Sequence, residues 1–342
     1  MFEIINRTPF VVSLIPGLGK DDVAHMTVLA KGTFSIPIPP GPPRIAEQQI
    51  PFWPGDEWNG PEPATSSVRF ESDACPTKPG TDVVLVGHAY AGARRQATVD
   101  VGLRVGKLQK VVRVTGDRIW TRAAFAWVMS SPPVAFERLP LVYERAFGGV
   151  DRSDPAQPAG DDRNPVGTGF DAAARKERLE GLRLPNLEDP RHLIRKWNDR
   201  PPVAGFGVIS RGWLPRRSLG GTYDQRWTEQ RNPLLPEDFD PRFFNGAPAD
   251  QVAVPHLRGG EPVSLSNCSP DGVLAFELPR IALSITIDWA AGPQAQEVPP
   301  VLDTVILDPD ERRIVMSWRS TFPCGRRLRQ VQRVVVRMAR GA

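Results

Sequence analysis

The sequence predicts a mainly β protein: a large antiparallel β-sandwich or barrel-like architecture with long Pro/Gly-rich loops and one or two short helices. The 342 residues include 37 prolines and 30 glycines, and a proline inside a helix removes a backbone donor and clashes with the preceding turn. Many strand-length segments alternate apolar and polar residues, as half-buried strands do. A hydrophobic content of 40% is enough for a large core and too high for a disordered chain.

Three segments are expected. Residues 1–150 form a β-meander scaffold, with a buried strand over 83–90 and a hairpin from 99–106 and 109–115. Residues 151–255 form a loop-rich insertion with short helices, one of them over 171–182 and another after 220–227. Residues 256–342 complete the fold with strands over 260–267, 273–278, 281–289, 301–307, 313–318 and 328–338. One continuous domain is the alternative to this division.

Charge and cysteine usage limit the partners and the compartment. The net charge is only +4, and the one clearly basic run, 326–340, alternates arginine with valine. That pattern favours a final strand with a solvated basic face over a nucleic-acid patch. Three widely separated cysteines, no recognisable signal peptide and no long apolar run predict a cytoplasmic protein with neither a nucleic-acid nor a membrane partner.

No catalytic, cofactor-binding or metal-binding residue is predicted. The four histidines are far apart and have no cysteine or histidine at zinc-ligand spacing. The chain lacks a Gly-x-Ser-x-Gly elbow and a Walker A loop, and the segment 167–169 lacks the last glycine of a dinucleotide fingerprint.

Paired carboxylates leave an enzymatic alternative open, because a glycosidase needs two carboxyl groups facing one another across a cleft. We instead expect Glu71 and Asp73 to accept backbone N–H groups within their Pro-rich loop, with Lys78 pairing with either of them. Glu144 and Arg145 are expected to form an internal ion pair that braces two loops.

Nine tryptophans in a loop-rich chain indicate either surfaces that stack on sugars and partners or loops anchored to the core. The candidate partner contacts are Trp53, Trp58, Trp213 and Trp227, because interface hot spots favour tryptophan. Core anchoring is the alternative for each of them.

The segment 139–151 places a tyrosine, an acid, a base, a phenylalanine and two glycines together. With no nucleophile or metal set elsewhere, we interpret it as architectural. Tyr143 and Phe147 should be buried, and Gly148-Gly149 should permit a turn that side chains forbid. The segment 164–170, equally rich in special backbone residues, should help this junction hold the two halves of the chain together.

The motifs of this chain, taken in their order along the sequence, resemble those of a bacterial family long labelled a domain of unknown function. Members of that family are associated with type VI secretion systems. The match covers nearly the whole chain. The residues that carry the resemblance are Glu71, Asp73, Lys78 and Asp82, Trp120, Tyr143, Glu144, Arg145, Phe147, Gly148 and Gly149, Asn164, Gly167 and Gly169, Tyr223 and Asp224, and Asp303.

The resemblance implies a non-enzymatic adaptor or chaperone, which binds a type VI effector in the cytoplasm and helps load it on the VgrG/PAAR spike. It implies no cofactor and no catalytic residue. Two other functions remain open: a carbohydrate-active or carbohydrate-binding protein that uses its Trp-bearing loops, and a structural component of the secretion apparatus.

Overall fold

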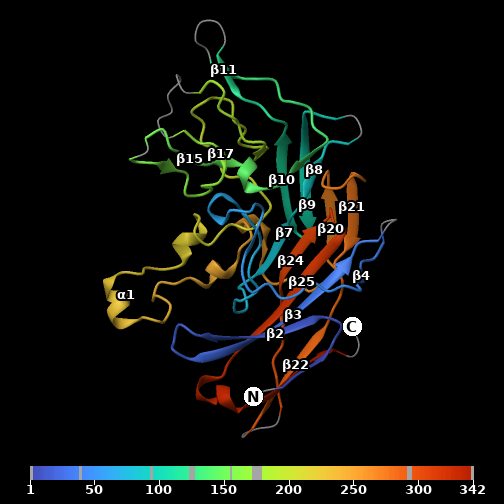
Figure 1. The fold of residues 1–342 in the computed structure, drawn as a ribbon. Helices are drawn as coiled ribbons and strands as arrows, with labels where there is room; N and C mark the ends of the chain where they lie inside the picture. Colours follow the sequence, from blue (N-terminus) through green and yellow to red (C-terminus); the bar gives the residue numbers. More distant parts are fainter. Residues whose placement is uncertain are drawn as a thin grey trace.

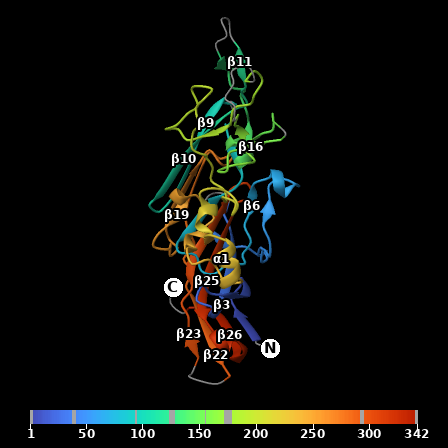
Figure 2. The same ribbon diagram turned by 90° about the vertical axis from the view of Figure 1, so that its left-hand side faces the viewer.

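A computed structural model describes residues 3–37, 41–92, 95–122, 128–154, 156–171, 179–290 and 295–339. The protein is mainly β, as predicted. Three larger sheets follow one another along an elongated molecule, and the four-stranded sheet lies at the end that carries both termini (Figures 1 and 2). Each sheet has open edges, so the barrel-like alternative is not formed.

The central sheet has the strand order β19-β7-β24-β25-β3-β2, with β4 beside β3. It contains strands from all three predicted segments. Its neighbouring strands are antiparallel except β7 and β24, which run parallel. The strands are β2 (Val11–Leu18), β3 (Ala24–Ser35), β4 (Arg44–Ile45), β7 (Thr81–Leu85), β19 (Val252–Ala253), β24 (Val301–Asp308) and β25 (Arg313–Pro323).

Two further sheets flank it. The five-stranded sheet, in the order β18-β10-β9-β20-β21, includes the expected hairpin. In the four-stranded sheet, β1-β26-β22-β23, β1 and β26 run parallel. Their strands are β9 (Thr98–Val105), β10 (Leu108–Thr115), β18 (Leu187–Glu188), β20 (Pro262–Ser266) and β21 (Val273–Glu277), then β1 (Glu3–Arg7), β22 (Leu283–Trp289), β23 (Gln296–Glu297) and β26 (Val331–Met338).

Shorter elements complete the described chain. The two-stranded pairs are β5 (Glu57–Trp58) with β6 (Val68–Phe70), β8 (His88–Tyr90) with β13 (Arg138–Pro140), β11 (Trp120–Arg122) with β12 (Val128–Ser130), β14 (Phe147–Gly148) with β17 (Thr168–Gly169), and β15 (Val150–Asp151) with β16 (Ala159–Gly160). The helix α1 spans Gln225–Gln230, so the short helix expected after 220–227 is present and begins within the end of that segment. The described 3-10 helices span Pro63–Thr65, Tyr143–Arg145, Arg216–Leu219, Pro241–Phe244, Ala249–Gln251 and Gly325–Gln330. The helix expected over 171–182 falls mostly on residues 172–178, which lie outside the described residues. Among the described helices, none has the length and apolar character needed to cross a membrane.

The central sheet buries both of its faces, in different ways. One face packs on the two flanking sheets through aliphatic and aromatic side chains, for example Leu307 toward the five-stranded sheet and Met26 toward the four-stranded sheet. The other face is covered by loops, where Trp53 and Phe70 pack near Val315. The central sheet is therefore covered by sheets on one face and by loops on the other. The candidate functional site lies on the loop-covered face.

The two glycine-rich segments interlock, as the sequence predicts. Tyr143 and Phe147 are buried, and the amide of Asn164 donates to their carbonyl oxygens over 2.8 and 3.1 Å. Gly148 and Gly149 have φ of +146° and +111°, a region that side chains rarely adopt. The N–H of Gly149 donates to the carbonyl of Asn164 over 2.8 Å, so the junction is held by backbone groups together with the side-chain amide of Asn164.

Gly148→Ala should lower the free energy of unfolding by about 3 kcal/mol, because its Cβ would collide with the carbonyl oxygen of Asn164 as well as strain the backbone. Gly181→Ala is the control: Gly181 has φ of +81° and open space around the position of a Cβ, so only about 1 kcal/mol should be lost there. Urea denaturation measures both values. Equal losses would contradict a close approach at Gly148.

Candidate functional site

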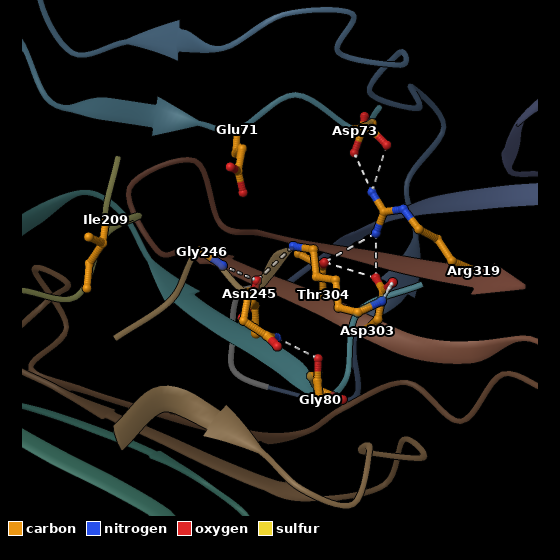
Figure 3. A network of polar contacts seen from close by, with 12 residues as sticks. Glu71, Asp73, Gly80, Ile209, Asn245, Gly246, Asp303, Thr304 and Arg319 are labelled. Carbon is orange, nitrogen blue, oxygen red and sulfur yellow. Dashed lines mark hydrogen bonds and ion pairs between the residues drawn. The ribbon is translucent and has the colours of Figure 1, made fainter. Parts of the chain in front are cut away.

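A network of six buried charged side chains lies on the loop-covered face of the central sheet. Its three cations and three carboxylates come from β3, β7, β24, β25 and the loop between β6 and β7, and Figure 3 shows part of it. The members are Lys31, Lys78, Arg319, Asp73, Asp82 and Asp303. Because isolated charges are expensive to bury, the equal numbers of the two signs are what allow this face to be covered.

Arg319 on β25 occupies the centre of the network. Its Nη1 contacts Oδ1 of Asp303 at 2.5 Å, and its Nη2 donates to the carbonyl of Asp73 over 3.2 Å. The register between β24 and β25 shifts between Leu302 and Thr304, so Asp303 is the extra residue of a β-bulge, a feature that redirects a side chain. Burial is the largest single effect and would lower the pKa of Arg319, but Asp303 and the other negative groups around it, Asp73 among them, together raise that pKa.

Lys31 on β3 fixes one loop against the sheet. Its Nζ lies 2.8 Å from Oδ2 of Asp73, donates to the carbonyl of Pro51 over 2.9 Å, and stands 3.0 Å above the centre of the Trp53 ring. The backbone N–H of Trp53 donates to the same carboxylate over 2.9 Å. Burial lowers the pKa of Lys31 to about 8, against the opposing effect of Asp73.

Lys78 and Asp82 form the third pair, with 2.7 Å between Nζ and Oδ2. Burial alone would lower the pKa of Lys78, but the carboxylate of Asp82 raises it. The amide of Asn245 and the backbone N–H of Gly246 each donate to Asp82 over 2.9 Å, and Asn245 also reaches the carbonyl of Gly80 (Figure 3). This pair therefore holds a second covering loop.

The partners expected within the Pro-rich loop are largely wrong. Asp73 does accept a backbone N–H, but Glu71 contacts two arginines: Nη2 of Arg216 at 2.6 Å and Nε of Arg211 at 2.9 Å. Lys78 pairs with Asp82, and with neither Glu71 nor Asp73. The arginines lie far along the chain, where local sequence cannot indicate them.

The ion pair expected between Glu144 and Arg145 is also wrong. Glu144 accepts from the N–H and the hydroxyl of Ser67, both over 2.6 Å. Arg145 contacts Asp117 at 3.1 Å and donates to the side-chain oxygen of Asn186 over 2.9 Å. The two adjacent side chains thus brace different loops, because each has a stronger geometric match in another segment.

Of the four candidate contact tryptophans, Trp53 and Trp213 are buried. Trp53 stacks on Phe70, with ring centres 4.6 Å apart, and Trp213 meets the ring of Tyr143 edge-on at 5.7 Å. In this structure both anchor loops to the core. Trp120 is likewise buried, in a small separate cluster.

Trp58 and Trp227 remain half-buried. Trp227 lies on α1, whose first turn is capped by the carboxylate of Asp224 over 2.8 Å. Its ring meets that of Tyr223, which is 56% exposed, at 4.7 Å. Trp227 and Tyr223 form a small surface pair at α1, whereas Trp58 packs against the cluster that contains Trp53 and Phe70.

The two glycines of the segment 164–170 lie where this segment meets the segment 139–151. Gly169 pairs with Gly148 between β17 and β14 and has φ of +97°. Gly167 donates its N–H to the carbonyl of Asn164 over 3.2 Å. Both serve the junction between the two segments.

A second polar cluster lines a cavity of about 600 Å³ near β8. Nδ1 of His88 lies 2.7 Å from Oδ2 of Asp310, and the hydroxyl of Tyr90 donates to Oδ1 of the same carboxylate over 2.9 Å. Within the part of the chain that the structure describes, no group of three His, Cys, Asp or Glu side chains could hold a metal ion.

Sequence reasoning missed Lys31, Arg319, Asn245 and Arg216. Lys31 and Arg319 stand at alternating positions of β3 and β25, where a charged residue normally indicates a solvated face. Arg216 begins a short 3-10 helix and Asn245 follows another, and neither segment has a distinctive sequence pattern. For Lys31 and Arg319, the one feature of the sequence that could have indicated a buried ion pair is a charged residue within an otherwise apolar strand.

Asp303→Asn should lower the free energy of unfolding by about 3–5 kcal/mol, because it leaves the buried guanidinium of Arg319 without its main counter-charge. The matched control is Glu137→Gln, which removes an exposed ion pair with Arg95 at 3.6 Å and should cost about 0.5 kcal/mol or less. Urea denaturation compares them. Similar small losses would mean that the network is not needed for stability.

Tyr143→Phe should change how stability depends on pH. Burial raises the pKa of Tyr143 above its ordinary value of 10.0. Above that pH the unfolded chain releases the phenol proton while the folded protein retains it, so this contribution falls as pH rises. The variant should lose about 1 kcal/mol near neutral pH, through the missing hydrogen bond to the Gly207 carbonyl, and the difference should shrink above about pH 10. A difference that stays constant in urea titrations at neutral and alkaline pH would contradict this.

Comparison with known proteins identifies the family but no activity. A search of curated proteins and a search of solved structures gave no match. A family model matches residues 21–319, a range that includes every member of the buried network. The chain therefore belongs to the bacterial family described as "uncharacterized protein conserved in bacteria (DUF2169)".

Proposed function

We propose that this protein is a non-enzymatic adaptor that binds a type VI secretion effector and helps load it on the VgrG/PAAR spike. The proposal rests first on the resemblance of its ordered segments to proteins associated with these systems. The family description names neither an activity nor a partner. The role in secretion is therefore proposed from the resemblance alone.

The observation that carries it is how the charged motif residues are used. Four carboxylates of these motifs each contact a cationic side chain, and each is at least nine-tenths buried. They are Glu71, Asp73, Asp82 and Asp303. Such carboxylates hold loops on a sheet and are poorly placed to act as a general acid and base on a substrate. This supports a binding scaffold over an enzyme.

The carbohydrate alternative receives less support. It needs exposed aromatic platforms or facing free carboxylates, whereas Trp53, Trp120 and Trp213 are buried in the core. A structural component of the apparatus remains a distinct alternative. It predicts stoichiometric incorporation into the assembled particle, which an adaptor does not require.

Deleting the gene should abolish delivery of the effector encoded beside it and lower the amount of that effector in the soluble fraction, while other effectors of the same cell are still delivered. Wild-type protein supplied in trans should restore both, and should co-purify with the effector. The readouts are immunoblots of secreted and soluble fractions. An effector that stays soluble and is delivered without this protein would refute the adaptor role, and its presence at fixed stoichiometry in purified particles would favour the structural one.

A further inference from the structure

The four-stranded sheet ends in a free edge at β1. This strand of 5 residues pairs with β26 on one side, and no described strand pairs with it on the other. No hydrogen bond between described residues occupies the backbone groups that β1 directs away from β26. One of its apolar side chains, Ile4, is 41% exposed. A strand edge of this kind can pair with a strand of another molecule.

The side chains of β1 alternate between the two faces of the sheet. Register partners share a face, so Ile4, which is opposite the buried Val334, lies on the inner face. Glu3, Ile5 and Arg7 lie on the outer face. The free edge therefore carries an acid, an apolar residue and a base at equal spacing on its outer face.

Two arginines on this outer face lack a counter-charge. Arg7 is the register partner of Arg337, and like charges directly opposite one another are destabilising. Neither arginine forms an ion pair with another residue that the structure describes. Glu3 contacts Nε of Arg333 through Oε2, over 3.2 Å, and its side chain is 62% exposed. Because a carboxylate accepts from several donors, Glu3 can still bind a second cation.

Antiparallel pairing of two β1 strands about a two-fold axis at Ile5 would bring these groups together. Glu3 of each copy then lies opposite Arg7 of the other copy, and Ile5 meets its own counterpart on the axis. On the inner face the two Ile4 side chains become diagonal neighbours, a separation that long side chains can bridge. A two-fold interface has to be complementary to itself, and the order acid, apolar, base meets that condition.

The other free edges of the three larger sheets lack this pattern. β2 is interrupted by Pro16 and Gly17, residues that weaken strand pairing. β21 places Val273, Ala275 and Glu277 on its exposed face, an order that contains an acid and no base. The edge strands β18, β19 and β23 have 2 residues each. Self-complementary charge thus distinguishes β1 from the remaining edges.

From these observations we infer that two copies of this chain associate through β1. The two strands pair in antiparallel orientation and join the two four-stranded sheets into one continuous sheet. Arg7 gains the acid that its own chain does not supply. The interface is small, so its Kd lies in about the micromolar range. This association is independent of the adaptor role.

Sedimentation equilibrium from about 1 to about 300 μM tests the association. The wild-type protein should pass from monomer to dimer over this range. Arg7→Glu should raise the Kd about tenfold or more, because it sets two acids opposite one another in each cross-strand pair. It should leave the fold intact, since within one chain the new acid faces Arg337. The matched control is Glu277→Lys at the edge of β21, which should leave the Kd unchanged.

A mixture of two variants tests the register. Glu3→Arg and Arg7→Glu should each be monomeric alone, because each sets like charges opposite one another across the axis. An equimolar mixture should associate at least as tightly as the wild-type protein, since every cross-strand pair then joins an acid and a base. A mixture that stays monomeric, although both variants have the circular dichroism spectrum of the wild type, overturns the inference.

Cross-linking tests the position of the axis without changing any charge. In an antiparallel pair, directly opposite Cα atoms are about 4.5–5.5 Å apart, a distance that a disulfide spans. Oxidised glutathione should therefore convert Ile5→Cys to a disulfide-linked dimer, and Ala275→Cys on β21 should stay monomeric. The inference is wrong if Ile5→Cys gives no linked dimer, if the wild type is monomeric at every concentration, or if Arg7→Glu and Glu277→Lys have equal effects.

Discussion

The fold depends on the buried guanidinium of Arg319 and the carboxylates placed around it. The central sheet carries polar side chains on a face that loops cover completely, so each charge there must meet an opposite charge before the loops can close. Asp303, Asp73 and, through a separate pair, Asp82 meet this need. Because the covering loops are held by directed contacts, their positions are specified more narrowly than apolar packing alone would achieve.

The same contacts connect the interior to the surface. Asp82 holds Asn245 and Gly246, and Asn245 lines a cavity beside β19. Lys31 holds the loop that carries Trp53. Buried ion pairs add little net stability compared with apolar residues of the same volume. Their value in this protein is geometric, since they fix the covering loops on the sheet.

Local sequence patterns predicted most of the longer strands but not the network, and the single strand expected over 83–90 is two strands, β7 and β8, in different sheets. The alternation over 281–289 and 313–318 predicted β22 and β25, because one buried face is enough to impose a period of two. The same pattern gave no sign that Lys31 and Arg319 are buried, since a sheet face covered by loops can carry the same polar residues as a face covered by water. Pairings such as Glu71 with Arg216 join segments far apart in the chain, and no local signal encodes them. The glycine-rich junction was predictable because its constraint is local: only glycine tolerates the backbone of Gly148 and Gly149.

The use of the motif residues inside the fold limits which surfaces a partner could contact. The charged motif residues are used inside the protein, and two of the four tryptophans that resembled contact residues are used in its core. Under the proposed adaptor role, a partner would have to contact groups that the scaffold leaves exposed, for example the side chains of Val254 and Tyr223. Such groups need no distinctive sequence pattern, because their chemistry comes from position. In such an arrangement the buried residues that define the fold and the exposed residues that would select a partner can change independently, which the proposed adaptor role requires.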